Sequence, residues 1–207
     1  MKGEHTCPRC RSIVRAPNMW SNAWRCDVHG EVHPVAPPRL PTPEHLHQIT
    51  RSARVPVWVP WPLPPGWLVT GTTFAGDELT GARATVMACT GPNRLGGVGE
   101  MIIAAEEPGI GLGASYAGID GPDPGADMID TPSHAKIHAA GHPTPLWWID
   151  AGENRTAYVG AAGGFWLWTV LWPEWADLLM VDGLTLLDAR DARLELDLPL
   201  GALSPRL

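Results

Sequence analysis

Three cysteines and a histidine near the start of the chain have the spacing of metal ligands. Cys7 and Cys10 are separated by two residues, 15 residues follow, and Cys26 and His29 are again separated by two. Thiolate sulfur and imidazole nitrogen are ligands that Zn²⁺ prefers, and two short pairs at this distance are typical of a zinc ribbon. Four protein ligands leave no open position for water. The pattern therefore predicts a structural zinc site and not a catalytic one.

Two tight turns must present these ligands, and short strands must connect the turns. We expect the strands at residues 13–14 and 20–25, with the chain turning between them at residues 16–18. In this arrangement Trp20 and Trp24 cover the metal. Because so small a module cannot fold on apolar burial alone, the ion is expected to supply most of its stability.

The fourth ligand has alternatives. His29 is preferred for its two-residue gap to Cys26, although His33 or His5 could take its place. A simpler interpretation makes the three cysteines buried apolar groups and the histidines exposed loop residues. The remaining cysteine, Cys89, lies in the apolar run ATVMAC, where we expect it to be buried in a strand.

Charge divides the chain into two parts. Residues 1–54 hold 8 Lys and Arg against 4 Asp and Glu, whereas residues 55–207 hold 7 against 18. This asymmetry indicates different partners for a basic front and an acidic body. The expected segments are a zinc ribbon at 1–35, a Pro-rich linker with a short helix at 36–54, an antiparallel α+β domain at 55–199 and a tail at 200–207.

The sequence favours a cytoplasmic protein. The start MKGEHTCPRC lacks the apolar core of a secretory signal, and free metal-type cysteines suit a reducing compartment. Thr156 to Pro173 is a stretch of 18 residues without a formal charge. Its internal glycines favour two strands about a turn, so we predict no membrane span.

The body reads as a series of short strands joined by turns. After the stiff extended spacer PVAPPRLPTP, Thr42 caps a short helix that begins at Pro43. Apolar and β-branched runs then alternate with turn signals such as GDELTG and GPNRLGG, which predicts hairpins. Strands are expected at residues 67–75, 83–90, 98–106, 135–140, 146–150, 155–161, 165–171, 184–189 and 193–198.

One convincing body helix is expected at residues 173–182, with Trp175, Leu178 and Leu179 as its apolar stripe. The fold class is therefore α+β: a small zinc ribbon followed by a curved antiparallel β-sheet domain with one or two short helices. The proline-rich segment VPVWVPWPLPPGW fits only an edge of this sheet.

The glycine-rich stretch PGIGLGASYAGIDGPDPG does not fit a nucleotide-binding loop. Gly109, Gly111 and Gly113 alternate, and no helix signature follows them. Such alternation favours a flat strand or a close backbone approach. The sequence also contains no G-x-S-x-G nucleophile elbow. We therefore recognise no set of catalytic residues in it.

Eleven tryptophans are the strongest compositional peculiarity of the chain. Trp147 and Trp148 must point to opposite faces of a strand, so at least one needs cover from another element or another chain. Trp166 and Trp168 share a face and are expected to pack against the body helix. Tryptophan is enriched at interfaces, which favours an exposed aromatic surface for a protein partner.

Three functions follow from these observations. The favoured one is a non-enzymatic zinc-ribbon protein that acts as a protein-binding or regulatory module. The second is a nucleic-acid-binding ribbon that places Arg9, Arg11, Arg15 and Arg25 on phosphates. The third is a small-ligand binder or enzyme that uses the concave face of the sheet.

Two resemblances add to this interpretation. The order LPPGWLVTG, two hairpins, GHPTPLWW, another hairpin and PEWADLLMV resembles the curved half-barrel domains of sigma-factor regulators and lipoprotein carriers. The whole chain, including CPRC, ARVPVWVPWPLPPGW, GIDGPDPG and GALSPRL, is similar to an uncharacterised actinobacterial domain-of-unknown-function family with an N-terminal zinc ribbon. The first resemblance implies a curved sheet. The second implies one continuous fold and carries no established activity.

Overall fold

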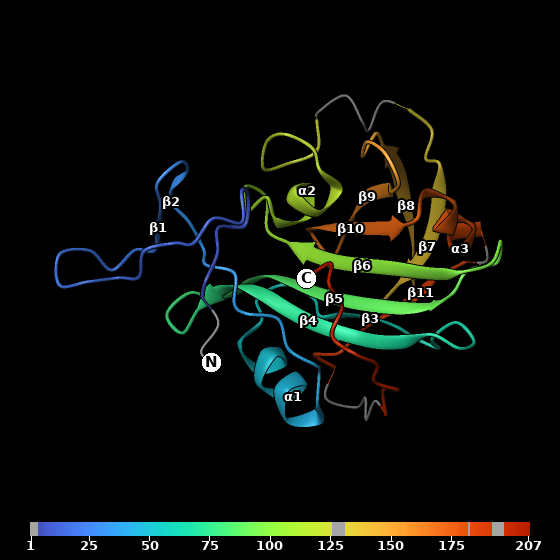
Figure 1. Cartoon of the computed structure of the whole chain (residues 1–207), viewed down its shortest axis with the longest axis horizontal. Coiled ribbons are helices and arrows are strands. Elements are labelled where there is room, and N and C mark those ends of the chain that lie inside the picture. The colour runs from blue at the N-terminus through green and yellow to red at the C-terminus, as the bar shows by residue number, and fades with distance from the viewer. Residues whose placement is uncertain (1–3, 126–130, 182, 192–196) are drawn as a thin grey trace.

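The computed structural model describes residues 4–125, 131–181, 183–191 and 197–207. In these parts a curled sheet of nine strands is the main element, and a projecting N-terminal ribbon carries a second sheet of two short strands (Figure 1). The ribbon strands are β1 (Arg25–Cys26) and β2 (Gly30–Glu31). The large sheet contains β3 (Trp58–Pro60), β4 (Leu68–Asp77), β5 (Gly81–Pro92), β6 (Val98–Glu106), β7 (Ala135–Ala139), β8 (His142–Ile149), β9 (Thr156–Ala162), β10 (Phe165–Trp172) and β11 (Thr185–Asp188).

The strand order is β3-β11-β7-β8-β9-β10-β6-β5-β4. The consecutive hairpins confirm the predicted meander, and β3 lies at an edge as its prolines require. The prediction of a wholly antiparallel sheet is wrong at one pairing, because β11 runs parallel to β7. The chain reaches this position by crossing over from β10 through a short helical segment. The sheet is therefore mixed. The strand expected at 193–198 falls mostly outside the described residues.

The stretch from Thr156 to Pro173 forms β9, a turn at Gly163 and Gly164, and β10, as predicted. Within the described residues, the structure contains no helix with both the length and the apolar character needed to cross a membrane.

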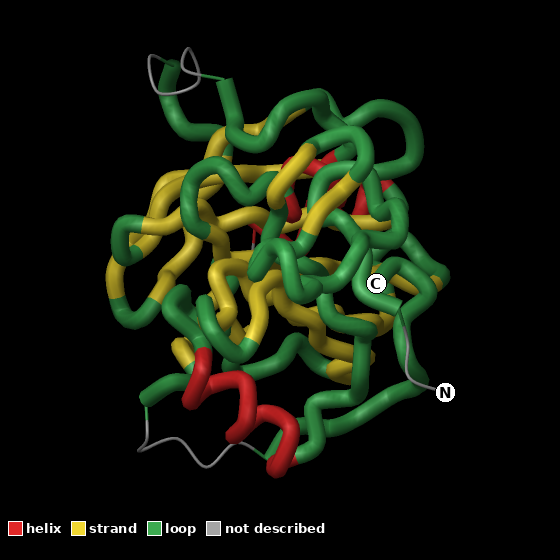
Figure 2. Tube along the Cα trace, turned by 90° about the vertical axis from the view of Figure 1, so that its left-hand side faces the viewer, coloured by secondary structure: helices red, strands yellow, loops and turns green. Residues whose placement is uncertain are grey.

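The sheet curls around one hydrophobic core (Figure 2). Two irregularities in β4, at Val69/Gly71 and at Ala75/Gly76, bend this strand, as β-bulges do. The curl brings β3 over β5 and β6. Buried side chains from both ends of the sheet fill the space inside, among them Met87, Ile103, Leu146, Leu167 and Leu186.

A second core lies on the outer face, under helix α2 (Leu112–Ala117). The strand considered for this glycine-rich stretch is wrong. Gly111 and Gly118 flank the helix with left-handed backbone, a conformation that glycine adopts without steric cost. The predicted close approach is confirmed, because a Cβ on Gly113 would collide with the indole ring of Trp168.

The proline-rich linker is extended, as predicted, and it is also hydrogen-bonded along the edge strand β4. Arg39 and Thr72 exchange two backbone hydrogen bonds of 2.9 and 2.7 Å, and the amide of Ala36 donates to the carbonyl of Phe74 at 2.9 Å. Helix α1 (Pro43–Ser52) follows, with the Thr42 hydroxyl accepting a hydrogen bond from its first turn. The linker thus covers the edge of the sheet instead of standing free of it.

The body helix predicted at 173–182 is a 3₁₀ turn, η2 (Glu174–Asp177), followed by α3 (Leu178–Val181). Its predicted apolar stripe is right at Leu179, which packs against the inner core, and wrong at Trp175, which is 45% exposed; Ala176 and Met180 are the buried residues of this segment. Short 3₁₀ geometry turns the buried face relative to a regular helix. Trp166 and Trp168 pack in the outer core with α2 and not against this segment, because alternate residues of β10 point to opposite faces of the sheet.

Candidate metal centre

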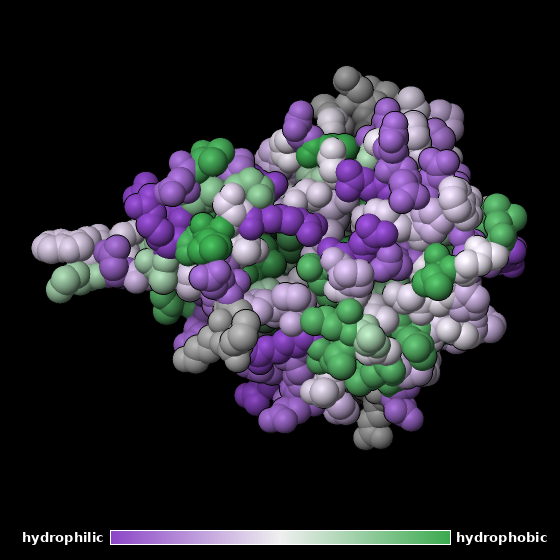
Figure 3. Space-filling view, in the orientation of Figure 1, coloured by the Kyte–Doolittle hydropathy of each residue, from purple (hydrophilic) through white to green (hydrophobic). Residues whose placement is uncertain are grey.

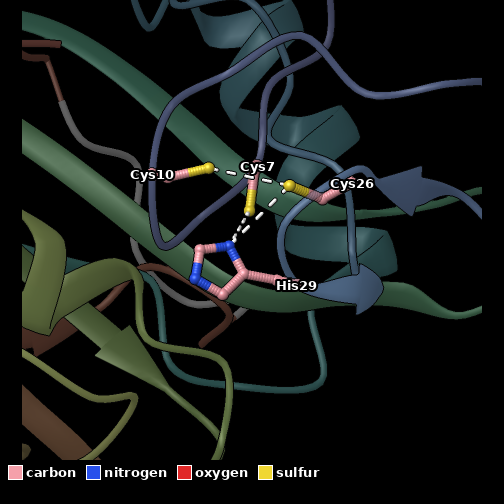
Figure 4. Close-up of side chains that lie close together, drawn as sticks. All are labelled: Cys7, Cys10, Cys26 and His29. Carbon is pink, nitrogen blue, oxygen red and sulfur yellow. Dashed lines mark hydrogen bonds between the residues drawn. The ribbon is translucent and has the colours of Figure 1, made fainter.

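The structure brings Cys7, Cys10, Cys26 and His29 together in the ribbon (Figure 4). One ligand atom from each lies within 4.8 Å of the other three. The Cys7 Sγ is 3.5 Å from the His29 Nδ1, the Cys26 Sγ is 3.7 Å from the same nitrogen, and the sulfurs of Cys10 and Cys26 are 3.6 Å apart.

These separations fit the edges of a tetrahedral zinc site. Bonds of zinc to sulfur and nitrogen imply edges of about 3.8 Å between two sulfurs and about 3.6 Å between sulfur and nitrogen. All three cysteines are free thiols, and the 3.6 Å between Cys10 and Cys26 is far longer than a disulfide bond. Three sulfurs and one nitrogen at these distances form a cluster that can hold a metal ion such as zinc.

Two turns position the ligands, as the spacing predicts. In the first, the amide of Cys7 donates to the carbonyl of Ser12 at 2.8 Å, and the amide of Arg11 donates to the carbonyl of Cys7 at 2.9 Å. In the second, Cys26 ends β1 and Gly30 begins β2 with a positive φ of 70°, which reverses the chain around His29. Each turn therefore points two ligand atoms at the same place.

The environment of the thiols differs between the two sides of the cluster. Cys7 and Cys26 are buried with Val14, whereas Cys10 is exposed. Burial raises the pKa of the Cys7 thiol to about 11, while a hydrogen bond with the Ser12 hydroxyl lowers the pKa of Cys10 to about 6. A bound metal would hold all three as thiolates, since coordination deprotonates a thiol outright.

The two alternative histidines lie outside the cluster. The His5 ring contacts the Trp24 ring with 4.7 Å between centroids. His33 faces the body, where partial burial and, to a smaller extent, the nearby Arg83 lower its pKa. Of the three candidate histidines, His29 is the one that lies with the three cysteines.

The hairpin between the two turns differs from its prediction. Bridges join Arg15 to Arg25 and Asn18 to Ser21, so the chain turns at Met19 and Trp20. The side-chain oxygen of Asn18 accepts a hydrogen bond from the Trp20 amide at 2.8 Å and fixes this turn.

Trp24 packs against the cluster as predicted, but the prediction that Trp20 covers the metal is wrong. Trp20 is 88% exposed and Met19 is 87% exposed. The hairpin points away from the sheet (Figure 1).

Arginines of the first turn attach the ribbon to the body, a role that the sequence did not reveal. The Arg9 guanidinium donates to the carbonyls of Gly109 and Ile110 at 2.5 and 3.3 Å. The guanidinium of Arg11 lies over the Tyr116 ring, 4.2 Å from its centroid. Such contacts join residues about a hundred positions apart, so no local spacing could have indicated them.

Cys89 takes no part in this centre. It is fully buried in β5, as predicted, and burial raises the pKa of its thiol to about 12.

Comparison with known proteins places the chain in a family. No curated protein and no solved structure matches it. One family model matches residues 1–207, which is the whole chain. The protein therefore belongs to DUF6758, a family of unknown function.

Proposed function

We propose that this chain is a non-enzymatic zinc-ribbon protein that acts as a protein-binding or regulatory module, with the tip of the ribbon hairpin as its recognition element. Cys7, Cys10, Cys26 and His29 hold a structural Zn²⁺ in this proposal. The ion fixes the base of the hairpin, and Met19 and Trp20 at its tip enter an apolar pocket of the partner.

The observation that carries this proposal is the exposure of two large apolar side chains at the end of a projecting hairpin. A small protein gains nothing in stability from exposing tryptophan, and tryptophan is enriched among residues that dominate binding energy. Ile13 and Val28 of the ribbon are also more than half exposed, which extends the apolar character toward the hairpin base. A cytoplasmic location suits the proposal, because a reducing compartment keeps three metal-binding thiols reduced.

Nucleic-acid binding receives less support. Of the arginines that motivate it, Arg9 and Arg11 contact the body, and Arg15 pairs with Asp27. Two of the four arginines therefore lie at the seam with the body instead of on a common outward face of the ribbon, which weakens the case for binding to a phosphate backbone.

A ligand site on the concave face of the sheet also receives less support. Side chains of the inner core fill this face, and Leu146, Leu167 and Leu186 are completely buried there. Both cavities described near the ribbon lie outside the curl of the sheet.

Site-specific photo-crosslinking in the native cell tests the proposal. A photoreactive phenylalanine analogue at position 20 should give one discrete protein adduct, and the same analogue at position 79 should give none. Leu79 is a matched control because it is also an apolar residue on an exposed turn, with 78% of its surface accessible.

The adduct at position 20 should disappear when Cys10→Ser is added, since the hairpin then loses its fixed base. Equal adducts from positions 20 and 79, or no adduct from position 20, would contradict the proposal.

A further inference from the structure

A cavity of about 310 Å³ lies at the seam where the ribbon meets the body. Its walls come from five parts of the chain: the ribbon between Glu4 and Arg11, the linker, Thr73 of β4, helix α2 and the C-terminal residue Leu207. The surface is hollowed between ribbon and body (Figure 3). Ligand pockets begin at about this volume, which suits a molecule of about one substituted aromatic ring.

The walls of this cavity are mainly apolar. Val35, Pro37, Leu112 and Leu207 line it, and both Val35 and Leu112 belong to the buried outer core. Displacing water from such walls favours an apolar molecule.

Two side chains that carry hydrogen-bond donors also line this cavity. Tyr116 is only 3% exposed and lines the cavity. Its hydroxyl can donate a hydrogen bond to an acceptor group of a molecule held there. Burial raises the pKa of Tyr116, which keeps the hydroxyl protonated and able to donate.

Arg11 supplies the second donor group. Its Nε and Nη1 atoms make two long hydrogen bonds of 3.4 Å, to the Ser115 hydroxyl and the Arg206 carbonyl, and its Nη2 bonds to no described residue. The guanidinium lies over the Tyr116 ring and lines the same cavity. Both groups therefore bring hydrogen-bond donors to the lining of the cavity.

We propose that this seam cavity binds a small apolar molecule with one hydrogen-bond acceptor group, a carboxylate or a carbonyl, that the Tyr116 hydroxyl and the Arg11 guanidinium recognise. This site lies apart from the hairpin tip and goes beyond the proposed function. Because Cys7 and Arg11 belong to the first ribbon turn, one wall of the site depends on the folded ribbon.

Titrations of the zinc-loaded full chain with three probes of similar shape test the inference, with binding followed by amide shifts of α2 in two-dimensional NMR. Benzoate and acetophenone carry an acceptor, and toluene carries none. At least one acceptor probe should bind about 5-fold more tightly than toluene, and comparison of the two identifies the acceptor as carboxylate or carbonyl.

Tyr116→Phe should weaken the acceptor probe about 3- to 10-fold and leave toluene unchanged, as loss of one hydrogen bond predicts. Ala36→Leu fills the cavity and retains the backbone bonds of the linker, so it should abolish binding of all probes. Met19→Ala at the hairpin tip should change nothing here, which separates this site from the proposed protein interface.

Absence of binding by every probe at about 10 mM would overturn the inference. So would toluene binding as tightly as the acceptor probes, or acceptor binding that Tyr116→Phe and Ala36→Leu leave unchanged.

Discussion

The guanidinium of Arg9 donates a hydrogen bond of 2.5 Å to the backbone carbonyl of Gly109, and this contact joins the metal-binding turn to the outer face of the sheet. Arg9 lies between Cys7 and Cys10, so the turn that presents two metal ligands also holds the ribbon against the body. Metal binding and the position of the ribbon are therefore linked through one short loop.

Arg9→Ala should loosen the ribbon without unfolding the sheet. The variant loses two hydrogen bonds from a charged donor, and we expect the free energy of unfolding to fall by about 1 to 2 kcal/mol. Backbone ¹⁵N relaxation should show greater motion in residues 7–29 than in the unmodified protein. The motion of β5 and β6 should not change. Arg15→Ala is the control, because its ion pair with Asp27 is largely exposed and worth little. Equal relaxation in both variants would contradict this role for Arg9.

Glu106 should make stability depend on pH. Its fully buried carboxylate accepts hydrogen bonds from the amides of Leu112 and Gly113 at the start of α2. Burial raises its pKa from 4.5 to about 7. The two amides favour the charged form, and the nearby Asp123 opposes it.

The folded state then binds more protons than the unfolded state between pH 4.5 and about 7. Stability should therefore fall as pH rises through this window, by an amount on the order of 3 kcal/mol. Urea unfolding at pH 5 and pH 7.5 measures the slope. Glu106→Gln should remove most of it and the exposed control Glu78→Gln should retain it, whereas an unchanged slope in Glu106→Gln would refute the assignment.

Gly113→Ala should be strongly destabilising although alanine favours helices. A Cβ at this position would overlap the Trp168 ring, which is completely buried, so α2 or the ring must move. We expect a loss of about 1 to 3 kcal/mol, typical of overpacking. Gly125→Ala is the control, because its Cβ would meet open space. A thermal midpoint of Gly113→Ala equal to that of this control would show that α2 does not pack as described.

Much of the strand pattern could be predicted because it is local. Alternating apolar residues and glycine-rich turns mark β4 to β10, and two short pairs of ligands mark the metal cluster. No local sequence pattern indicates the parallel pairing of β11 with β7, because this pairing depends on the path of the chain through η2 and α3.

The two errors at functional positions have physical causes. Helix α2 is only six residues long, so its flanking glycines outweighed its helix-forming leucine and alanines in the prediction. Gly118 after its last turn was an available signal for a helix end. The sequence predicts a strand at Trp20 because APN at residues 16–18 is a turn signal, whereas the side chain of Asn18 accepts from the Trp20 amide and begins the turn two residues later.

Zinc K-edge X-ray absorption on protein purified under reducing conditions tests the central claim most directly. We predict one zinc per chain, bound by three sulfurs at about 2.3 Å and one nitrogen at about 2.0 Å. The number of sulfur ligands should be lower in Cys26→Ser. Zinc well below one ion per chain, or a ligand shell of oxygen and nitrogen that Cys26→Ser leaves unchanged, would contradict a structural site formed by Cys7, Cys10, Cys26 and His29.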